Sequence, residues 1–352
     1  MRRVTTLAAA LLAGALVLTS CGGDGDDDEA NTTPKGEGSS SAPASDIKVG
    51  LAYDIGGRGD QSFNDAAAAG LDKAADEFGI ETNEAEAANG EPESAKEERL
   101  RALAGAGFNP VIAVGFAYSG AVKKVAAELP DTQFAIIDDA AATGDNIANL
   151  LFAEEQGSFL VGAAAALKSE SGNIGFVGGV DVPLIHKFQA GYEAGAKEVN
   201  PDIEVQVKYL TQPPDFSGFG DPAKGKTAAA GMFDKGADVV YQAAGGSGGG
   251  VFEAAMDAGG FAIGVDSDQY NTADPAVKDV IITSMLKKVD VAVYDFISTV
   301  VEGNFTAGPV TYDLEKDGVG YSTSGGKIDD IKAQLDKYKQ DIIAGTIKVP
   351  EA

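Results

Sequence analysis

Short apolar runs alternate with helical patterns along the chain from residue 47 onward. Eight runs combine β-branched residues with Gly or Asp at their ends, so they predict buried strands at residues 47–53, 110–115, 133–138, 174–178, 203–210, 237–242, 261–266 and 280–284. The stretches between them carry apolar residues at helical spacing, and one such face holds Val289, Val293, Phe296, Ile297, Val300 and Val301. Strands that alternate with helices predict an α/β fold with doubly wound parallel sheets.

The length of this region sets the expected number of lobes. Residues 46–352 form a longer segment than a single hydrophobic core usually stabilises, so two lobes are expected. The two expected lobes share no visible sequence repeat, although the alternation of strands and helices occurs twice.

Polar residues and glycines gather directly after the predicted strands. In open parallel sheets, ligands lie at the carboxyl ends of strands, where helix N-termini point outward. The residues at these ends are Asp54, Asp138, Gly245, Gly246, Asp266 and Lys287. Each aspartate has an alternative interpretation as the cap of the next helix. Together they favour a single binding site.

The N-terminus has the features of an export signal. Two arginines precede an apolar run over residues 7–18, and small residues separate that run from Cys21, the only cysteine. The run is too short to span a membrane. The tetrapeptide Leu-Thr-Ser-Cys that ends at Cys21 resembles the bacterial lipoprotein signal, which implies that residues 1–20 are removed and the cysteine is lipidated. An ordinary signal peptide with an incidental cysteine is the alternative.

Lipidation would hold the protein at the extracytoplasmic face of the cell membrane. Residues 21–46 lack large apolar side chains, so they predict a disordered acidic tether. Without the two arginines of the signal, 25 basic residues face 54 acidic ones, a net charge of −29. Such a surface repels nucleic acid and anionic lipid, so contact with the membrane is expected only through the lipid anchor.

Several segments in colinear order resemble one family. They are VGLAYD at 49–54, GDQSFNDAAAAGL at 59–71, FAIID at 134–138, NIGFVGG at 173–179, FGDPAKGK at 219–226, GADVVYQAAGGSGGGVFEAA at 236–255, IGVDSDQ at 263–269 and ITSMLKKVDVAVYD at 282–295. The chain thereby resembles the basic membrane protein (BMP) family of lipoproteins, of the purine nucleoside receptor type. The resemblance covers nearly all of residues 47–350.

This resemblance implies a fold and a function. The fold is periplasmic binding protein type I, in which two α/β lobes are joined by three crossovers at a hinge and close on a small ligand. Lobe 1 would comprise residues 47–153 with 286–306, and lobe 2 residues 154–285 with 307–352. Members are substrate-binding components of ABC importers for nucleosides, and some bind riboflavin instead. The expected partners are therefore a nucleoside and a transporter permease, and the chain is expected to act as a monomer.

The motifs of the family also imply ligand-binding residues. Phe63 of the Ser-Phe-Asn motif would stack on the base beside Asn64, and Phe219 would supply the second ring, with nearby Phe216 as its competitor. The remaining positions are Asp54, Asp138, Gly245, Gly246, Asp266 and Lys287. A purine has apolar faces and polar edges, so two rings and several carboxylates suit it, and a lysine could partner the carboxylates.

Phe63 also has a structural interpretation. It shares one helical face with Ala67, Leu71, Ala74 and Phe78, which is typical of core packing. Residues 62–65 resemble a capping box that starts this helix. Both interpretations are compatible with a ligand contact, because the first turn of the helix would face the cleft.

Three motifs point elsewhere. Residues 220–227 match the phosphate-binding pattern G-x-x-x-x-G-K-T, but no buried strand directly precedes them, and Asp221 with Pro222 is better interpreted as a helix cap and first turn. The tripeptide at 58–60 matches an adhesion motif but lies in the expected ligand-facing loop. The glycine run at 245–250 lacks dinucleotide-binding spacing and is expected to let backbone approach the ligand or start a helix.

Catalysis and cofactors are not expected. His186 is the only histidine and is expected on the surface at a helix start, so neither a His/Cys metal cluster nor a nucleophile–histidine pair assembles easily. The chain is therefore expected to be a receptor without a cofactor or metal. The rival is an exported enzyme that hydrolyses nucleosides or related glycosides with carboxylates alone. A sensor that reports ligand to a membrane kinase is a third possibility.

Overall fold

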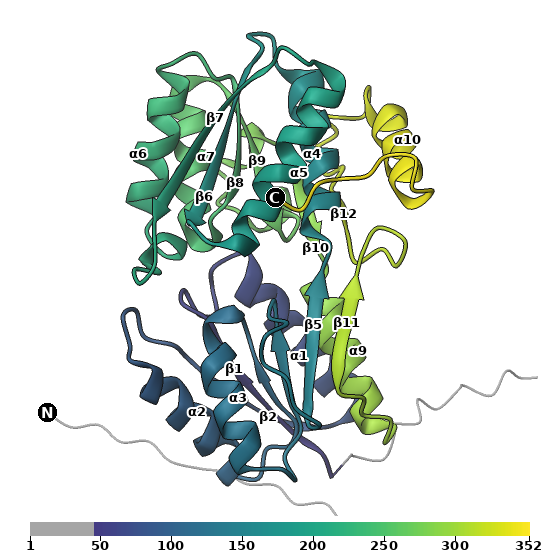
Figure 1. Cartoon of the computed structure of the whole chain (residues 1–352). Helices are drawn as coiled ribbons and strands as arrows, with labels where there is room; N and C mark the ends of the chain where they lie inside the picture. Colours follow the sequence, from purple (N-terminus) through teal and green to yellow (C-terminus); the bar gives the residue numbers. More distant parts are fainter. Residues whose placement is uncertain (1–45) are drawn as a thin grey trace, which may run out of the picture. The chain divides into compact units, whose positions relative to one another are not determined.

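The computed structural model describes residues 46–352. The expected signal peptide, most of the tether and Cys21 lie outside the described residues. Within residues 46–352, two six-stranded sheets form the cores of two lobes, each flanked by helices (Figure 1). The predicted α/β class is confirmed.

The first lobe is built on a sheet in the order β11-β5-β4-β3-β1-β2, in which all neighbouring strands run parallel. Its strands are β1 (Lys48–Ala52), β2 (Glu81–Ala85), β3 (Val111–Ala113), β4 (Phe134–Ile137), β5 (Ile147–Phe152) and β11 (Gly308–Tyr312). Its helices are α1 (Phe63–Phe78), α2 (Glu93–Gly105), α3 (Ser119–Glu128) and α9 (Val289–Val301). Helix α1 contacts α9, and α2 contacts α3.

The second lobe is built on a sheet in the order β12-β10-β9-β8-β6-β7, parallel except for the β10–β12 pair. Its strands are β6 (Asn173–Val180), β7 (Glu204–Thr211), β8 (Val239–Ala243), β9 (Phe261–Asp266), β10 (Ile281–Lys287) and β12 (Val319–Tyr321). Its helices are α4 (Glu154–Lys168), α5 (Pro183–Val199), α6 (Pro222–Phe233), α7 (Gly248–Ala258), α8 (Gln269–Thr272) and α10 (Lys332–Ile343).

The chain passes between the two sheets three times. The passages follow β5, β10 and β11. The expected first-lobe segment 286–306 begins too early, because Leu286 and Lys287 still belong to β10 of the second sheet. The expected assignment of residues 307–352 to the second lobe is wrong for β11, which pairs with β5 of the first sheet. The reason is that α9 packs against α1 of the first lobe, so the strand that follows after a short turn is added to the same sheet.

All eight predicted strands are present, and four further strands escaped prediction. Strand β2 is largely exposed at the edge of its sheet, and β11 is exposed at three of its five positions. Strand β12 has only three residues. Strand β5 is an apolar run interrupted by Asn149, whose amide donates to the backbone carbonyls of Asp139 and Ala142. These strands therefore escaped prediction because two are exposed, one is very short and one contains a buried polar side chain.

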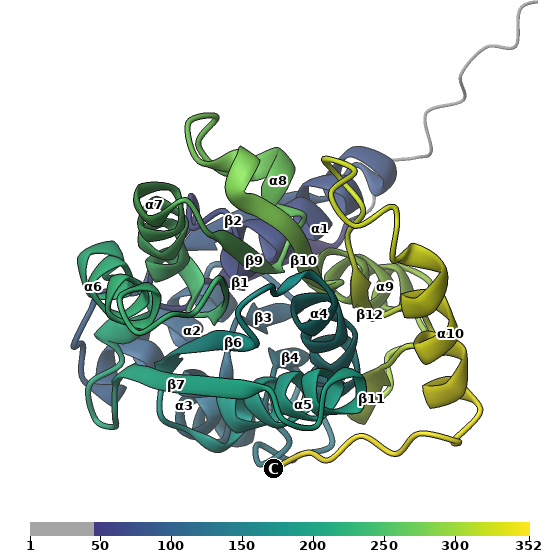
Figure 2. The same cartoon turned by 90° about the horizontal axis from the view of Figure 1, so that it is seen from above.

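Two helices of the second lobe approach unusually closely. Helices α4 and α5 lie side by side (Figure 2). A Cβ on Gly191 of α5 would collide with the backbone of Glu155 in α4, so only glycine allows this approach. The close packing fixes the N-termini of both helices beside the point where the chain enters the second lobe.

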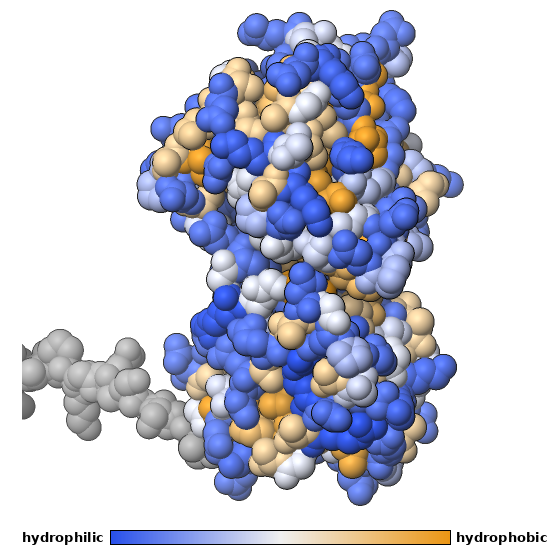
Figure 3. All heavy atoms as spheres, turned by 90° about the vertical axis from the view of Figure 1, so that its left-hand side faces the viewer, coloured by the Kyte–Doolittle hydropathy of each residue, from blue (hydrophilic) through white to orange (hydrophobic). Residues whose placement is uncertain are grey.

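One face of the described unit is mostly polar. Figure 3 shows hydrophilic residues over most of the visible face and an indentation between its upper and lower parts. Among the described residues, no helix is both long enough and apolar enough to cross a membrane.

Candidate functional site

A cavity lies between the two lobes at the carboxyl ends of their strands. Its empty volume, including space open to solvent, is about 550 Å³. Eight of the nine predicted ligand-binding residues line it: Asp54, Phe63, Asn64, Asp138, Phe219, Gly245, Asp266 and Lys287. Gly246 does not line the cavity.

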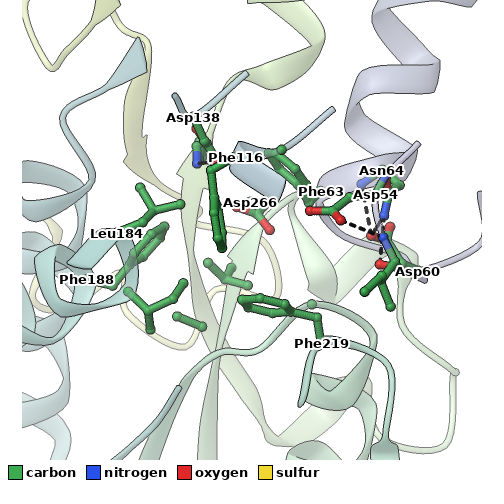
Figure 4. A pocket seen from close by; sticks show the side chains of 17 residues that line it. Asp54, Asp60, Phe63, Asn64, Phe116, Asp138, Leu184, Phe188, Phe219 and Asp266 are labelled. Carbon is green, nitrogen blue, oxygen red and sulfur yellow. Dashed lines mark hydrogen bonds and ion pairs between the residues drawn. The ribbon is translucent and has the colours of Figure 1, made fainter. Parts of the chain in front are cut away.

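Asp60 organises the first-lobe side of the cavity, a role that the sequence did not reveal. Its carboxylate accepts hydrogen bonds from the backbone N–H groups of Ser62, Asn64 and Asp65, at 2.9, 2.9 and 3.1 Å. It also accepts from the Asn64 side chain at 3.0 Å, and the Asn64 carbonyl oxygen accepts from the backbone N–H of Asp54 at 2.9 Å. These bonds fix the start of α1 against the end of β1 (Figure 4).

The predicted capping box at residues 62–65 is therefore wrong. Ser62 occupies the N-cap position of α1, but its side chain makes no capping hydrogen bond. Its hydroxyl instead donates to Oδ2 of Asp266 in the second lobe at 2.6 Å. Asp65 accepts from the backbone N–H groups of Gly59 and Gln61. Asp60 caps the helix because the preceding loop turns its carboxylate back over the first N–H groups.

The position of Phe63 is compatible with both of its predicted interpretations. Its ring is partly buried against the hydrophobic core and also lines the cavity. Lys287 Nζ lies 5.1 Å from the centre of this ring, 5.0 Å from that of Phe152 and 5.5 Å from that of Phe188. The rings thereby surround the ammonium group within the distance typical of cation–π contacts.

Lys287 is the cation of the cavity. Its side chain is almost fully buried, and Nζ lies 2.5 Å from Asp138 and 3.2 Å from Glu154. Burial alone lowers the pKa of Lys287, but Asp138, Glu154 and Asp266 outweigh that effect and raise it. The lysine therefore stays protonated and holds the carboxylates together.

The cavity nevertheless holds more carboxyl groups than this one cation can neutralise. Burial raises the pKa of Asp54 to about 7, although the backbone N–H of Ile55 opposes the shift. Burial also raises the pKa of Glu154 to about 7 and that of Asp266 to about 6, each against the attraction of Lys287. Oδ1 of Asp138 is buried and accepts no hydrogen bond from any residue between 46 and 352. The site is rich in acceptors and suits a ligand that brings N–H or O–H donors.

The two candidate aromatic residues of the second lobe, Phe219 and Phe216, have different surroundings. Phe219 lines the cavity, whereas Phe216 packs edge-on against Phe116, with ring centres 6.0 Å apart and an interplanar angle of 61°. Phe116 and Phe188 also line the cavity and escaped prediction. Phe116 comes just after a predicted strand, so the same strand-end argument that found the aspartates could have found it.

The motifs that pointed elsewhere have structural explanations. Asp221 caps α6 by accepting from the backbone N–H of Lys224 at 3.0 Å, and Lys226 pairs with Glu253 and Asp257, so the phosphate-loop lookalike is a capped helix start as expected. Arg58 is bound by Glu84 and Asp72. His186 lies in the first turn of α5, partly exposed, with Asp181 at 2.7 Å. Among the described residues, no cluster of three or more His, Cys, Asp and Glu side chains could hold a metal ion.

Comparison with known proteins shows which family has this sequence. Residues 47–352 match the Bmp family, described as ABC transporter substrate-binding protein, PnrA-like. The chain belongs to this family. Among its relatives, the CD4+ T-cell-stimulating antigen of Listeria innocua is 34% identical over 97% of this chain and 96% of that protein. The ABC transporter nucleoside-binding protein BmpA of Lactococcus lactis subsp. cremoris is 32% identical over 99% of each chain.

The Bmp fold is also seen in solved structures. A crystal structure of an ABC transporter solute-binding protein from Aeropyrum pernix K1 superposes with a TM-score of 0.75 and 32% identity, covering 87% of this chain and 94% of that one. The predicted type I periplasmic binding fold is confirmed. As a Bmp member, the chain is an ABC transporter substrate-binding protein, so a small-molecule ligand and a transporter are its functional partners.

Proposed function

We propose that this protein is a lipid-anchored, extracytoplasmic receptor that captures nucleosides, purine nucleosides above all, and delivers them to an ABC importer. The observation that carries this proposal is the composition of the cavity. Aromatic rings and acceptor carboxylates line the same space, with a single buried lysine among them. The nucleoside-binding name of the Lactococcus relative supports the same ligand class.

The proposed binding mode assigns each side of the cavity to one part of a nucleoside. Phe63 of the first lobe and Phe219 of the second lobe stack on the two faces of the base, which is flat and apolar. Asp54, Asn64 and Asp138 contact its polar edges. The uncommitted oxygen of Asp138 suits an N–H donor, because a buried acceptor without a partner is costly.

The ribose belongs beside Asp266 and Lys287 in this mode. A carboxylate accepts hydrogen bonds from sugar hydroxyls, and the ammonium group donates to a hydroxyl or ring oxygen. Both residues end strands of the second lobe, whereas Phe63 belongs to the first. A bound nucleoside therefore bridges both lobes and stabilises the closed arrangement, which the importer can distinguish from the open one.

Capture without catalysis is part of the proposal. The rival is hydrolysis of the glycosidic bond by the same carboxyl groups, since burial raises the pKa values of Asp54, Asp138 and Asp266. Incubation of the protein with inosine separates the two functions. We expect inosine to be recovered intact, and release of free hypoxanthine at a rate proportional to protein concentration would establish the enzyme instead.

The ligand is identified by mass spectrometry of whatever small molecule is carried through purification, followed by titration calorimetry. We expect guanosine, inosine or adenosine to bind more tightly than uridine, because a purine offers the larger stacking surface. Riboflavin is included in the series, since its ring system is also flat and apolar. Saturable binding of riboflavin without binding of any nucleoside would overturn the proposed ligand.

The anchor is tested separately from the cavity. Replacing Cys21 with Ala removes the proposed lipidation site, so the protein is expected in the soluble fraction instead of the membrane fraction. Ligand affinity should change less than twofold, because the cavity is built from residues beyond 46. Retention of Cys21→Ala in the membrane fraction would contradict the lipid anchor.

A further inference from the structure

Ser62 holds an unusual position at the start of α1. Its neighbours Asp60, Phe63 and Asn64 line the cavity, whereas Ser62 is completely buried and does not line it. Its hydroxyl donates to Oδ2 of Asp266, 204 positions further along the chain and in the other lobe, at 2.6 Å. This O–H to carboxylate distance is typical of a charge-assisted hydrogen bond.

The backbone beside Ser62 is held by the second lobe as well. Ser267 Oγ donates to the Ser62 carbonyl oxygen at 3.1 Å, and Gln269 Nε2 donates to that of Gln61 at 3.1 Å. Thr272 Oγ1 donates to the Gln61 carbonyl oxygen at 3.3 Å. Gln61 has a φ of 56°, a conformation that non-glycine residues adopt only when their surroundings enforce it. The hydroxyl of Ser62 thus reaches Asp266 only where the two lobes meet in this way.

Asp266 presents its two oxygens to different partners. Oδ2 accepts from Ser62, whereas Oδ1 takes no part in that hydrogen bond. Its side chain lines the cavity, and Figure 4 shows its carboxylate turned into that space. Asp266 also has a φ of 62°, so its backbone is held in the same uncommon conformation as Gln61. The charged and titratable groups around it are Lys287, Asp138, Asp60 and Tyr241.

We propose that Ser62 is a positioning residue that makes sugar recognition depend on lobe closure. Closure brings its hydroxyl to one oxygen of Asp266 and leaves the other free to accept from the ligand. This inference rests on the proposed function, in which Asp266 accepts from a ribose hydroxyl. According to this inference, the Asp266 carboxylate is correctly oriented for the ligand only when Ser62, at the start of α1 in the first lobe, donates to it.

Loss of the hydroxyl changes the chemistry of Asp266 in a defined direction. The Ser62 hydrogen bond stabilises the ionised carboxylate and lowers its pKa, against the larger raising effect of burial. Without Ser62, the pKa rises further, so the carboxyl group gains its proton at a higher pH. A protonated carboxyl is a poorer acceptor for a hydroxyl, so affinity is lost at a higher pH than in the parent protein.

The test compares Ser62→Ala with Ser267→Ala. Both remove one serine hydroxyl from the contact between the lobes, but only Ser62 contacts the Asp266 side chain. Inosine binding is measured by calorimetry from pH 8 to pH 5. Ser62→Ala is expected to weaken binding about tenfold and to move the acid limb of the affinity profile upward by about one pH unit. Ser267→Ala should leave the position of that limb unchanged.

A double-variant cycle adds specificity. In an Asp266→Asn background, Ser62→Ala should cost less than twofold, because the carboxylate that Ser62 orients is already gone. Equal losses for Ser62→Ala and Ser267→Ala without a displaced acid limb would overturn the proposal and leave only a general contact between lobes. A Ser62→Ala variant that binds like the parent protein would overturn it as well.

A ligand-free measurement separates this inference from the proposed function. Carbon-13 NMR titration of the Asp266 carboxyl group should give a higher pKa in Ser62→Ala than in the parent protein, and no change in Ser267→Ala. If the parent protein binds no ribonucleoside, the proposed function fails. The NMR titration still decides whether Ser62 controls Asp266, and an unchanged pKa would reject that control.

Discussion

At the scale of single residues, the cavity contains buried carboxyl groups that have too few cationic and hydrogen-bonding partners within the protein. Three buried carboxyl groups share one buried lysine, and an oxygen of Asp138 accepts no hydrogen bond within residues 46–352. A site of this kind gains most from a ligand that brings several donors and little negative charge. Nucleosides meet that condition, whereas nucleotides carry phosphates that these carboxylates repel.

The proposed stacking role of Phe63 gives the first prediction. Phe63→Ala should weaken every base-containing ligand by about 1–3 kcal/mol, as loss of base–aromatic stacking does elsewhere. Lys226→Ala is the control, because Lys226 belongs to the phosphate-loop lookalike and is held by Glu253 and Asp257 away from the cavity. Calorimetry with guanosine measures both. The pocket assignment fails if Lys226→Ala loses affinity while Phe63→Ala keeps it.

The second prediction concerns the sugar. Asp266→Asn should weaken ribonucleosides by about 1.5–3 kcal/mol, and 2′,3′-dideoxy analogues by clearly less, because only ribonucleosides lose a charge-assisted hydroxyl contact. In the parent protein, ribonucleoside affinity should fall as the pH drops through about 6, where Asp266 becomes protonated. A loss of the same size for both ligand types would place the sugar elsewhere.

At the scale of elements, helices α1 and α6 both begin with an aspartate cap, but only α1 begins beside the cavity. Asp60 caps α1 beside the cavity, and Asp221 caps α6 outside it. Asp60→Ala should cost about 0.5–2 kcal/mol of unfolding free energy and should also weaken ligand binding, because Asn64 loses its partner. Asp221→Ala should lower stability without changing affinity. Thermal unfolding and calorimetry on both variants distinguish a shared structural role from a role in the site.

The sequence predicted the elements better than it predicted their contacts. Apolar runs revealed eight strands, and placing polar residues at strand ends brought Asp54, Asp138, Asp266 and Lys287 to one cavity. Asp60 escaped because its capping role depends on the path of a loop and not on residue spacing. The Ser62–Asp266 bond escaped because it joins two lobes, and a local pattern at residues 62–65 offered a plausible but wrong partner.

At the scale of the whole molecule, ligand binding should change how the two lobes meet. We expect small-angle scattering to give a smaller radius of gyration with saturating inosine than without it, and the melting temperature to rise, because the ligand stabilises the state that binds it. A variant that lacks the stacking ring, Phe63→Ala, serves as the control at the same ligand concentration. Identical scattering profiles for the parent protein with and without bound ligand would contradict closure.

The position of β11 has a consequence for how the protein is made. The first sheet contains strands from the beginning of the described chain, yet its edge strand comes from residues 308–312. The first lobe can therefore be completed only after synthesis has passed residue 312. Neither lobe is a contiguous fragment that could be cloned alone, and contacts of such long range slow folding. A chain truncated before residue 308 would leave the outer edge of β5 unpaired and open to association with other chains.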